Sequence, residues 1–200
     1  MSKLLASLFV CGLLAAVPAA AQDPHAGHKM PAAPAATPSP AQNYFGDIPL
    51  VNQDGRPMRL YSDLLKDKIV VIDVIFTTCT GVCPVLSGTF AKFQDRLGDR
   101  LGKDVLLLSI SVDPVNDTPA KLKEYAARFK ARPGWHFLTG SKENVDAALR
   151  KLGQYVENKE AHQNLFILGN ERTGLWKKAF GLAKPEDLYP VLDSVVNDKG

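Results

Sequence analysis

The chain has 200 residues, with a hydrophobic content of 46%, a charged content of 22% and a formal net charge of +3. This length is enough for one domain with a sizeable core, and the composition is ordinary for a globular protein. No block of Lys or Arg indicates nucleic-acid binding, and so small a net charge says little else about partners.

The first 21 residues have the features of a secretory signal peptide. Lys3 precedes an apolar run from Leu4 to Ala16, and Ala19-Ala20-Ala21 offers an A-x-A cleavage site. The apolar run is too short for a comfortable membrane span, although an uncleaved anchor is the alternative. We therefore expect a periplasmic protein whose mature chain has no membrane span.

Cleavage after Ala21 removes Cys11, so the mature protein keeps two cysteines, Cys79 and Cys83. Disulfides form readily in an oxidising compartment. A single pair of closely spaced cysteines in such a compartment indicates a functional role for Cys79 and Cys83 more than a structural disulfide.

Residues 22–43 are rich in Ala and Pro and lack a periodic apolar face, which predicts a disordered tether. The segment contains His25, His28 and Met30. Imidazole and thioether both suit copper, so this cluster could collect copper weakly. So few ligands in a tail favour the alternative, a polar tail with chance histidines.

A folded domain is predicted over residues 44–200. Asp54-Gly55 lies between two short apolar runs and predicts an N-terminal β-hairpin. A helical turn is expected near 63–65. Strands are expected at 69–76, 105–112, 135–138, 165–168 and 175–180. Helices are expected from about 82, from Pro119 after Thr118, after Ser141, and around 188–195, where Pro190 either kinks the helix or marks its start.

Alternating strands and helices, followed by a strand pair and a final helix, predict an α/β sandwich with a mixed sheet. A close cysteine pair at a strand-to-helix turn is typical of thioredoxin-like folds. The fold class expected is therefore a thioredoxin-like fold with a central mixed sheet flanked by helices.

The two cysteines follow the β-branched strand 69–76 and lie where the next helix begins. We expect that helix to bury one apolar face, made of Val82, Val85, Leu86, Phe90, Phe93 and Leu97, with both cysteines outside this pattern. Backbone N–H groups at the start of a helix favour a thiolate. Cys79 and Cys83 could hold a soft metal together or form a disulfide.

A third ligand is the open question for this pair. The chain does not supply two further ligands near the cysteines, as a zinc site would need. Two thiolates and one imidazole would suit copper. His162, just before the strand at 165–168, is the candidate, with an ordinary surface histidine as the equal alternative. His136 lies inside a predicted strand and is interpreted as a partly buried structural residue.

Three motifs resemble the Sco/SenC family of copper-binding proteins. They are the Cys-x3-Cys-Pro run within Phe76–Pro84, the run Ser111–Pro114 followed by Asp117–Pro119, and His162 about eighty residues after the cysteines. The resemblance covers residues 44 to about 196. It implies a thioredoxin-like fold and copper held by Cys79, Cys83 and His162. It also implies assembly of the dinuclear copper centre of cytochrome c oxidase, with the oxidase copper-site subunit or another periplasmic copper protein as partner.

The chain departs from this family at two positions. Ala161 stands where the family usually has Asp. Asp73, six residues before Cys79, matches a buried Asp of thioredoxins, whereas the family more often has an apolar or aromatic residue. Asp73 could accept a proton from a thiol, or could lie near the sheet edge with a local hydrogen bond.

Asp73 supports an alternative function, a thiol-disulfide oxidoreductase that uses Cys79 and Cys83 as its redox pair to keep cysteines of a copper-site protein reduced. The lack of Pro between 156 and 168, where thioredoxins have a cis-Pro, favours metal binding instead. The two roles are compatible, because an oxidised pair must be reduced before it binds copper.

Overall fold

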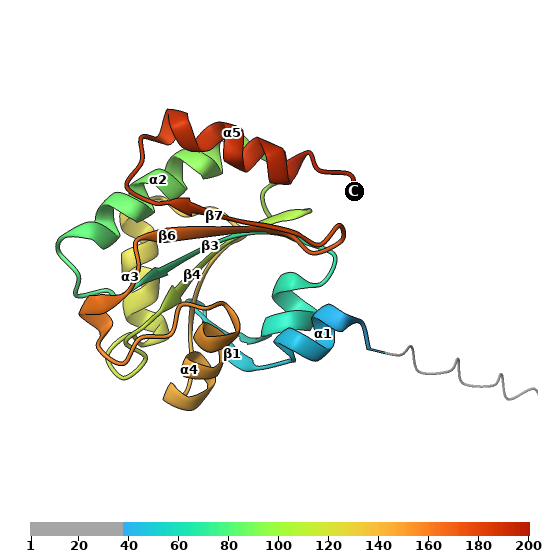
Figure 1. The fold of residues 1–200 in the computed structure, drawn as a ribbon. Helices are drawn as coiled ribbons and strands as arrows, with labels where there is room; N and C mark the ends of the chain where they lie inside the picture. The colour runs from blue at the N-terminus through green and yellow to red at the C-terminus, as the bar shows by residue number, and fades with distance from the viewer. Residues whose placement is uncertain (1–37) are drawn as a thin grey trace, which may run out of the picture. The chain divides into compact units, whose positions relative to one another are not determined.

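A seven-stranded mixed sheet in the order β2-β1-β5-β4-β3-β6-β7 runs through the protein (Figure 1). The computed structural model describes residues 38–200. The predicted signal peptide with Cys11, and the tether histidines His25 and His28 with Met30, lie outside the described residues.

The strands agree closely with those predicted. Their bounds are β1 Pro49–Asn52, β2 Pro57–Arg59, β3 Ile69–Ile75, β4 Val105–Ser111, β5 Trp135–Thr139, β6 Leu165–Asn170 and β7 Leu175–Phe180. The pairs β3–β4 and β4–β5 are parallel, and all other neighbours are antiparallel. The expected N-terminal hairpin is β1–β2, where the Asn52 side chain accepts from two turn N–H groups and Gly55 has φ +76°.

The helices also follow their sequence signals. Their bounds are α1 Pro40–Phe45, α2 Val82–Leu97, α3 Pro119–Arg128, α4 Lys142–Lys151 and α5 Pro185–Val196, with single turns at Leu60–Leu65, Gly98–Arg100 and Lys159–Ala161. Thr118 and Ser141 cap α3 and α4 by accepting from backbone N–H groups.

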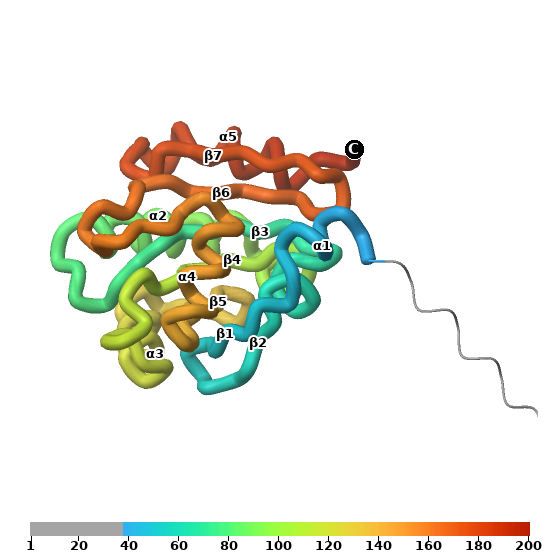
Figure 2. Tube along the Cα trace, turned by 60° about the horizontal axis from the view of Figure 1, so that its bottom comes forward, coloured from blue at the N-terminus to red at the C-terminus, as the bar shows by residue number. Residues whose placement is uncertain are grey.

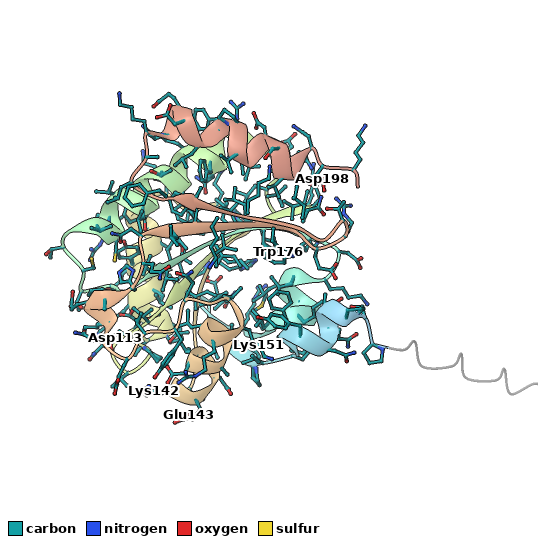
Figure 3. All side chains as sticks on the ribbon, viewed as in Figure 1. Asp113, Lys142, Glu143, Lys151, Trp176 and Asp198 are labelled. Atoms are coloured by element: carbon teal, nitrogen blue, oxygen red, sulfur yellow. The ribbon has the colours of Figure 1, made fainter. Side chains whose placement is uncertain are left out.

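The helices cover both faces of the sheet. Apolar residues of α2, α3 and α5 form one core with alternate residues of β3, including Ile69, Val71 and Ile75. The other residues of β3 face a second core with α1 and α4. Figure 1 shows α2 and α5 on one side of the sheet and α1 and α4 on the other, and Figure 3 labels Trp176 of β7 on the side of α1. The predicted mixed α/β architecture is confirmed.

Three details differ from expectation. Helix α1 begins at Pro40, so residues 40–43 at the end of the predicted tether are helical, and Phe45 is buried in the second core. Pro190 lies inside α5 and does not mark its start, because the helix begins at Pro185, where a missing N–H is harmless. Val85, expected in the buried face of α2, is 56% exposed.

None of the helices within residues 38–200 is long and apolar enough to cross a membrane.

Candidate metal and thiol site

The two cysteines occupy a tight turn between β3 and α2. Cys79 precedes the helix, and its N–H donates to the Phe76 carbonyl across 3.1 Å. The N–H of Cys83, in the first turn of α2, points to the Cys79 sulfur at 3.4 Å. Both cysteines are free thiols. The predicted location at a strand-to-helix turn is therefore correct.

The two thiols have opposite environments. Cys79 is partly exposed, whereas Cys83 is fully buried among the apolar residues of the core beneath α2. The expectation that both cysteines lie outside the apolar pattern is thus wrong for Cys83. This residue packs in the core as a small hydrophobic side chain does.

These environments separate the acidities of the thiols. Partial burial raises the pKa of Cys79, but the Cys83 thiol and the backbone N–H groups of residues 81–83 stabilise its thiolate, so its pKa lies below the ordinary value. Burial raises the pKa of the Cys83 thiol far above the ordinary value, and the neighbouring Cys79 sulfur raises it further. Cys79 is therefore the thiol of the pair that ionises more readily.

His162 approaches the cysteines from a distant part of the chain. Its Nε2 lies 3.7 Å from the Cys83 sulfur, although 79 positions separate the two residues. Its Nδ1 is buried without a hydrogen-bond partner among the described residues, and its ring packs edge-on against Phe76. The structure thus brings together the three side chains selected from the sequence.

An open cleft of about 340 Å³ lies over this group, between the turn 78–82 and the residues Glu160, His162 and Asn164. Figures 1 and 2 both show the segment after β3 and the segment before β6 at the same end of the sheet. Through this cleft, Cys79 and His162 are accessible to a ligand or a partner.

The donor set fits a soft metal ion. A metal ion bonded to sulfur at about 2.3 Å and to nitrogen at about 2.0 Å, with a trigonal angle between the bonds, holds these two donor atoms roughly 3.7 Å apart. This separation matches the distance between the Cys83 sulfur and His162 Nε2. Within residues 38–200, no group of three or more His, Cys, Asp or Glu side chains is already arranged as a metal site. The geometry therefore provides two donors at metal spacing and a third close by.

Asp117 supports the cysteine turn through hydrogen bonds from the residues that precede it. Its fully buried carboxylate accepts from the Thr77 hydroxyl at 2.5 Å, from the Thr77 N–H, and from the Ser111 hydroxyl at 2.6 Å. Thr77 is two residues before Cys79. Asp117 therefore fixes the start of the turn to the end of β4.

Asp113 supports the histidine segment in the same way. Its carboxylate accepts from Lys159 Nζ at 2.7 Å and from the Asn116 amide at 2.9 Å. Lys159 belongs to the single helical turn before His162. Sequence reasoning noted Asp113 and Asp117 as parts of a motif without assigning them these contacts. Their signal was a pair of carboxylates directly after a buried strand.

Asp73 lies in the central strand β3, fully buried and on the same sheet face as the core that contains Cys83. Neither carboxylate oxygen has a partner at hydrogen-bond geometry among the described residues. Burial raises the pKa of Asp73 to about 7, and the hydroxyl of Ser109, opposite on β4, offsets part of this shift. The alternative of a sheet-edge Asp with a local hydrogen bond is therefore wrong.

His136, as predicted, is a partly buried residue of β5. Burial lowers its pKa, so the neutral ring is favoured.

Comparison with known proteins decides the family. Residues 36–196 match the family model described as SCO1/SenC. The chain belongs to the SCO1/SenC family. It is 36% identical over 125 residues to the SCO1 protein homolog of Bacillus subtilis, an alignment that covers 58% of this chain and 63% of the relative. The chain spans less than two-thirds of the length of this and other curated SCO1/SenC relatives.

Solved SCO1/SenC structures have the same thioredoxin-like fold. BsSco, described as a member of the Sco family of cytochrome c oxidase assembly proteins with a disulfide switch, matches with a TM-score of 0.62 and 31% identity over 76% of this chain and 92% of that chain. Bradyrhizobium japonicum ScoI with copper bound matches with a TM-score of 0.61 and 26% identity over 74% of this chain and 96% of that chain. The predicted family and fold class are confirmed.

Proposed function

We propose that this protein is a periplasmic copper carrier that holds copper through Cys79, Cys83 and His162. Its cargo would be delivered during assembly of the dinuclear copper centre of cytochrome c oxidase. The observation that carries this proposal is the 3.7 Å distance between the Cys83 sulfur and His162 Nε2. The copper-bound relative and the assembly role in the description of BsSco support it.

Thiolates and imidazole together accept copper in both of its common oxidation states. Cys79, with its lowered pKa, supplies the first thiolate. It must turn toward Cys83 and His162 for all three donors to share one ion. Cys83 must lose its proton on binding, since only the thiolate is a good ligand.

Asp73 is the group proposed to take that proton. Its charge acts on Cys83, whose pKa it raises, and its own pKa of about 7 allows it to exchange a proton near neutral pH. When Cys83 ionises, its proton moves to the Asp73 carboxylate. The buried negative charge thereby moves from Asp73 to Cys83, and the number of buried charges does not change.

The second candidate function is reduction of disulfides in a copper-site protein, favoured by the unequal acidities of the two thiols. The Cys79 thiolate would attack a target disulfide and form a mixed disulfide. Cys83 would then lose its proton to Asp73 and attack the Cys79 sulfur. The target protein leaves with both of its cysteines reduced, and Cys79 and Cys83 remain joined by a disulfide.

X-ray absorption of the copper-loaded mature protein tests the ligand set. We expect one copper per chain, with two sulfur neighbours and one nitrogen neighbour. A best fit without sulfur would overturn the carrier, and four sulfur neighbours would indicate a site shared between two molecules.

Two variants separate carrier from reductase. His162→Ala should lose most Cu(II) affinity but keep a reversible Cys79–Cys83 disulfide. Asp73→Asn should slow thiol exchange and leave the copper stoichiometry intact. If His162→Ala binds Cu(II) as tightly as wild type, and Asp73→Asn alone impairs function in cells, the reductase function replaces the carrier.

A further inference from the structure

Strongly exposed large apolar side chains gather at one end of the sheet. Five such side chains occur in the described residues, and only Tyr44 of α1 lies away from this end. The other four, which we name the apolar rim, are Val85, Val115, Phe180 and Leu182, exposed by 56%, 75%, 59% and 41%.

The strand register sets these side chains on both sides of the metal site. The parallel strands β3 and β4 end at the paired residues Ile75 and Ser111, and β6 begins where β7 ends, at the pair Leu165 and Phe180. Along this end of the sheet, the order is therefore Val115 after β4, the cysteine turn after β3, His162 before β6 and the rim residues of 180–182 after β7.

Gly181 ties the rim to the site. Its N–H donates to the carbonyl of Asn164 at 2.8 Å, and Asn164 borders the cleft over Cys79. A Cβ added to Gly181 would lie 2.5 Å from Leu86 of α2. The backbone between Phe180 and Leu182 thus packs directly against the helix that carries Cys83 and against the segment that carries His162.

The surface around the cleft also carries few charges, and Glu160 is the one Asp, Glu, Lys or Arg residue among those that line the cleft. Residues 74–91, 114–116, 161–170 and 179–183 contain no Asp, Glu, Lys or Arg, although 22% of the whole chain is charged. Lys159, at the edge of the site, is neutralised by Asp113. Depletion of charge at the centre of a patch is the compositional mark of protein–protein interfaces.

We propose that the apolar rim is the docking surface for the copper acceptor, a folded protein whose metal-binding loop is bordered by apolar and uncharged side chains. The inference rests on the proposed function. Scattered apolar side chains on a surface are ordinary, but these four surround an accessible thiol and imidazole. A partner seated on them would exclude water from the metal while its own ligands enter the cleft. The absence of a cationic patch around the cleft favours a protein over an anionic membrane surface.

The test is copper transfer to detergent-solubilised cytochrome c oxidase that lacks its dinuclear copper centre. The rate is measured against carrier concentration for wild type, Phe180→Ser and Leu182→Ser. The control is Tyr44→Ser, which removes an aromatic side chain of similar exposure, 54%, on α1. Copper affinity of each variant is measured separately.

Each rim variant should raise the half-saturating concentration about five- to tenfold, with unchanged copper affinity, while the control stays at the wild-type value. Raising the salt from 50 to 500 mM should change the wild-type value by less than about twofold, because few charges are involved.

If both rim variants transfer copper as well as wild type does, or if wild-type transfer weakens steeply with salt, the docking proposal is overturned while the proposed function stands. A wild-type protein that binds copper but delivers none to the oxidase overturns the proposed function and the rim with it. Loss of binding to phosphatidylglycerol vesicles in Phe180→Ser, with transfer unchanged, would assign the rim to a membrane and overturn the proposal.

Discussion

Lys159 and Asp113 form an ion pair, with Nζ 2.7 Å from Oδ2, that joins the histidine segment to the loop after β4. The same loop holds the cysteine turn through Asp117 and Thr77. Residues 113–117 are therefore a common support for the two halves of the proposed metal site. Figure 3 labels Asp113 at this end of the molecule.

Loss of the ion pair should loosen the histidine half of the site. In Lys159→Met the segment before His162 loses its link to Asp113, so we expect Cu(II) affinity to fall about three- to tenfold. Competition with a chelator of known affinity measures this change. Lys142→Met, which breaks an exposed pair with Asp146 on α4, is the matched control and should leave affinity unchanged. Equal effects in both variants would show that Lys159 does not position His162.

Asp117→Asn should weaken the cysteine turn and the fold together. An amide offers one acceptor oxygen where the carboxylate satisfies the Thr77 N–H and the hydroxyls of Thr77 and Ser111. Buried donors left unpaired cost about 1–3 kcal/mol in the free energy of unfolding. Urea unfolding of the metal-free protein measures this cost. An unchanged midpoint would contradict the supporting role of Asp117.

The sequence predicted the elements well because their local signals agree with the tertiary fold. Capping residues at Thr118 and Ser141, the turn at Asp54-Gly55 and the β-branched run of β3 each act within a few neighbouring residues. The meeting of Cys83 and His162 required knowledge of a long-range contact, which came from the resemblance of three motifs to a family.

The error at Val85 has a geometric cause. The apolar face predicted for α2 includes Val85 and excludes Cys83. At about 100° per residue, Leu86, Phe90, Phe93 and Leu97 form one narrow buried group, with Cys83 at the edge next to Phe90. Val85 lies beyond the opposite edge of this group. Leaving Cys83 out and including Val85 therefore shifts the predicted face toward Val85, which in fact lies at the surface beside the site.

The two cysteines should differ in reactivity. Cys79 is partly exposed with a lowered pKa, whereas Cys83 is buried with a raised pKa. After reduction, iodoacetamide at pH 7 should modify Cys79 at least about 100-fold faster than Cys83. Peptide mass spectrometry over time measures both rates, and urea-unfolded protein is the control in which the rates should converge. Similar rates in the folded protein would contradict the assigned nucleophile.

Asp73 should make the metal-free protein less stable as the pH rises toward neutrality. The pKa of this carboxyl is about 7 in the folded protein and near 3.8 in the unfolded chain, so the folded state holds an extra proton between these values. Its contribution to the free energy of unfolding is fully present below pH 3.8 and is lost as the pH rises through 7, by about 4 kcal/mol at most.

Urea unfolding of reduced, metal-free wild type and Asp73→Asn between pH 4 and 8 measures this loss. The amide of the variant cannot ionise, so its free energy of unfolding should decline less than that of wild type over this range and should exceed the wild-type value at pH 8. Other carboxyls titrate in both proteins, and the difference between the two curves therefore isolates Asp73. Parallel curves would mean that Asp73 ionises in the folded protein as readily as in the unfolded chain, which would also remove it as the proton acceptor for Cys83.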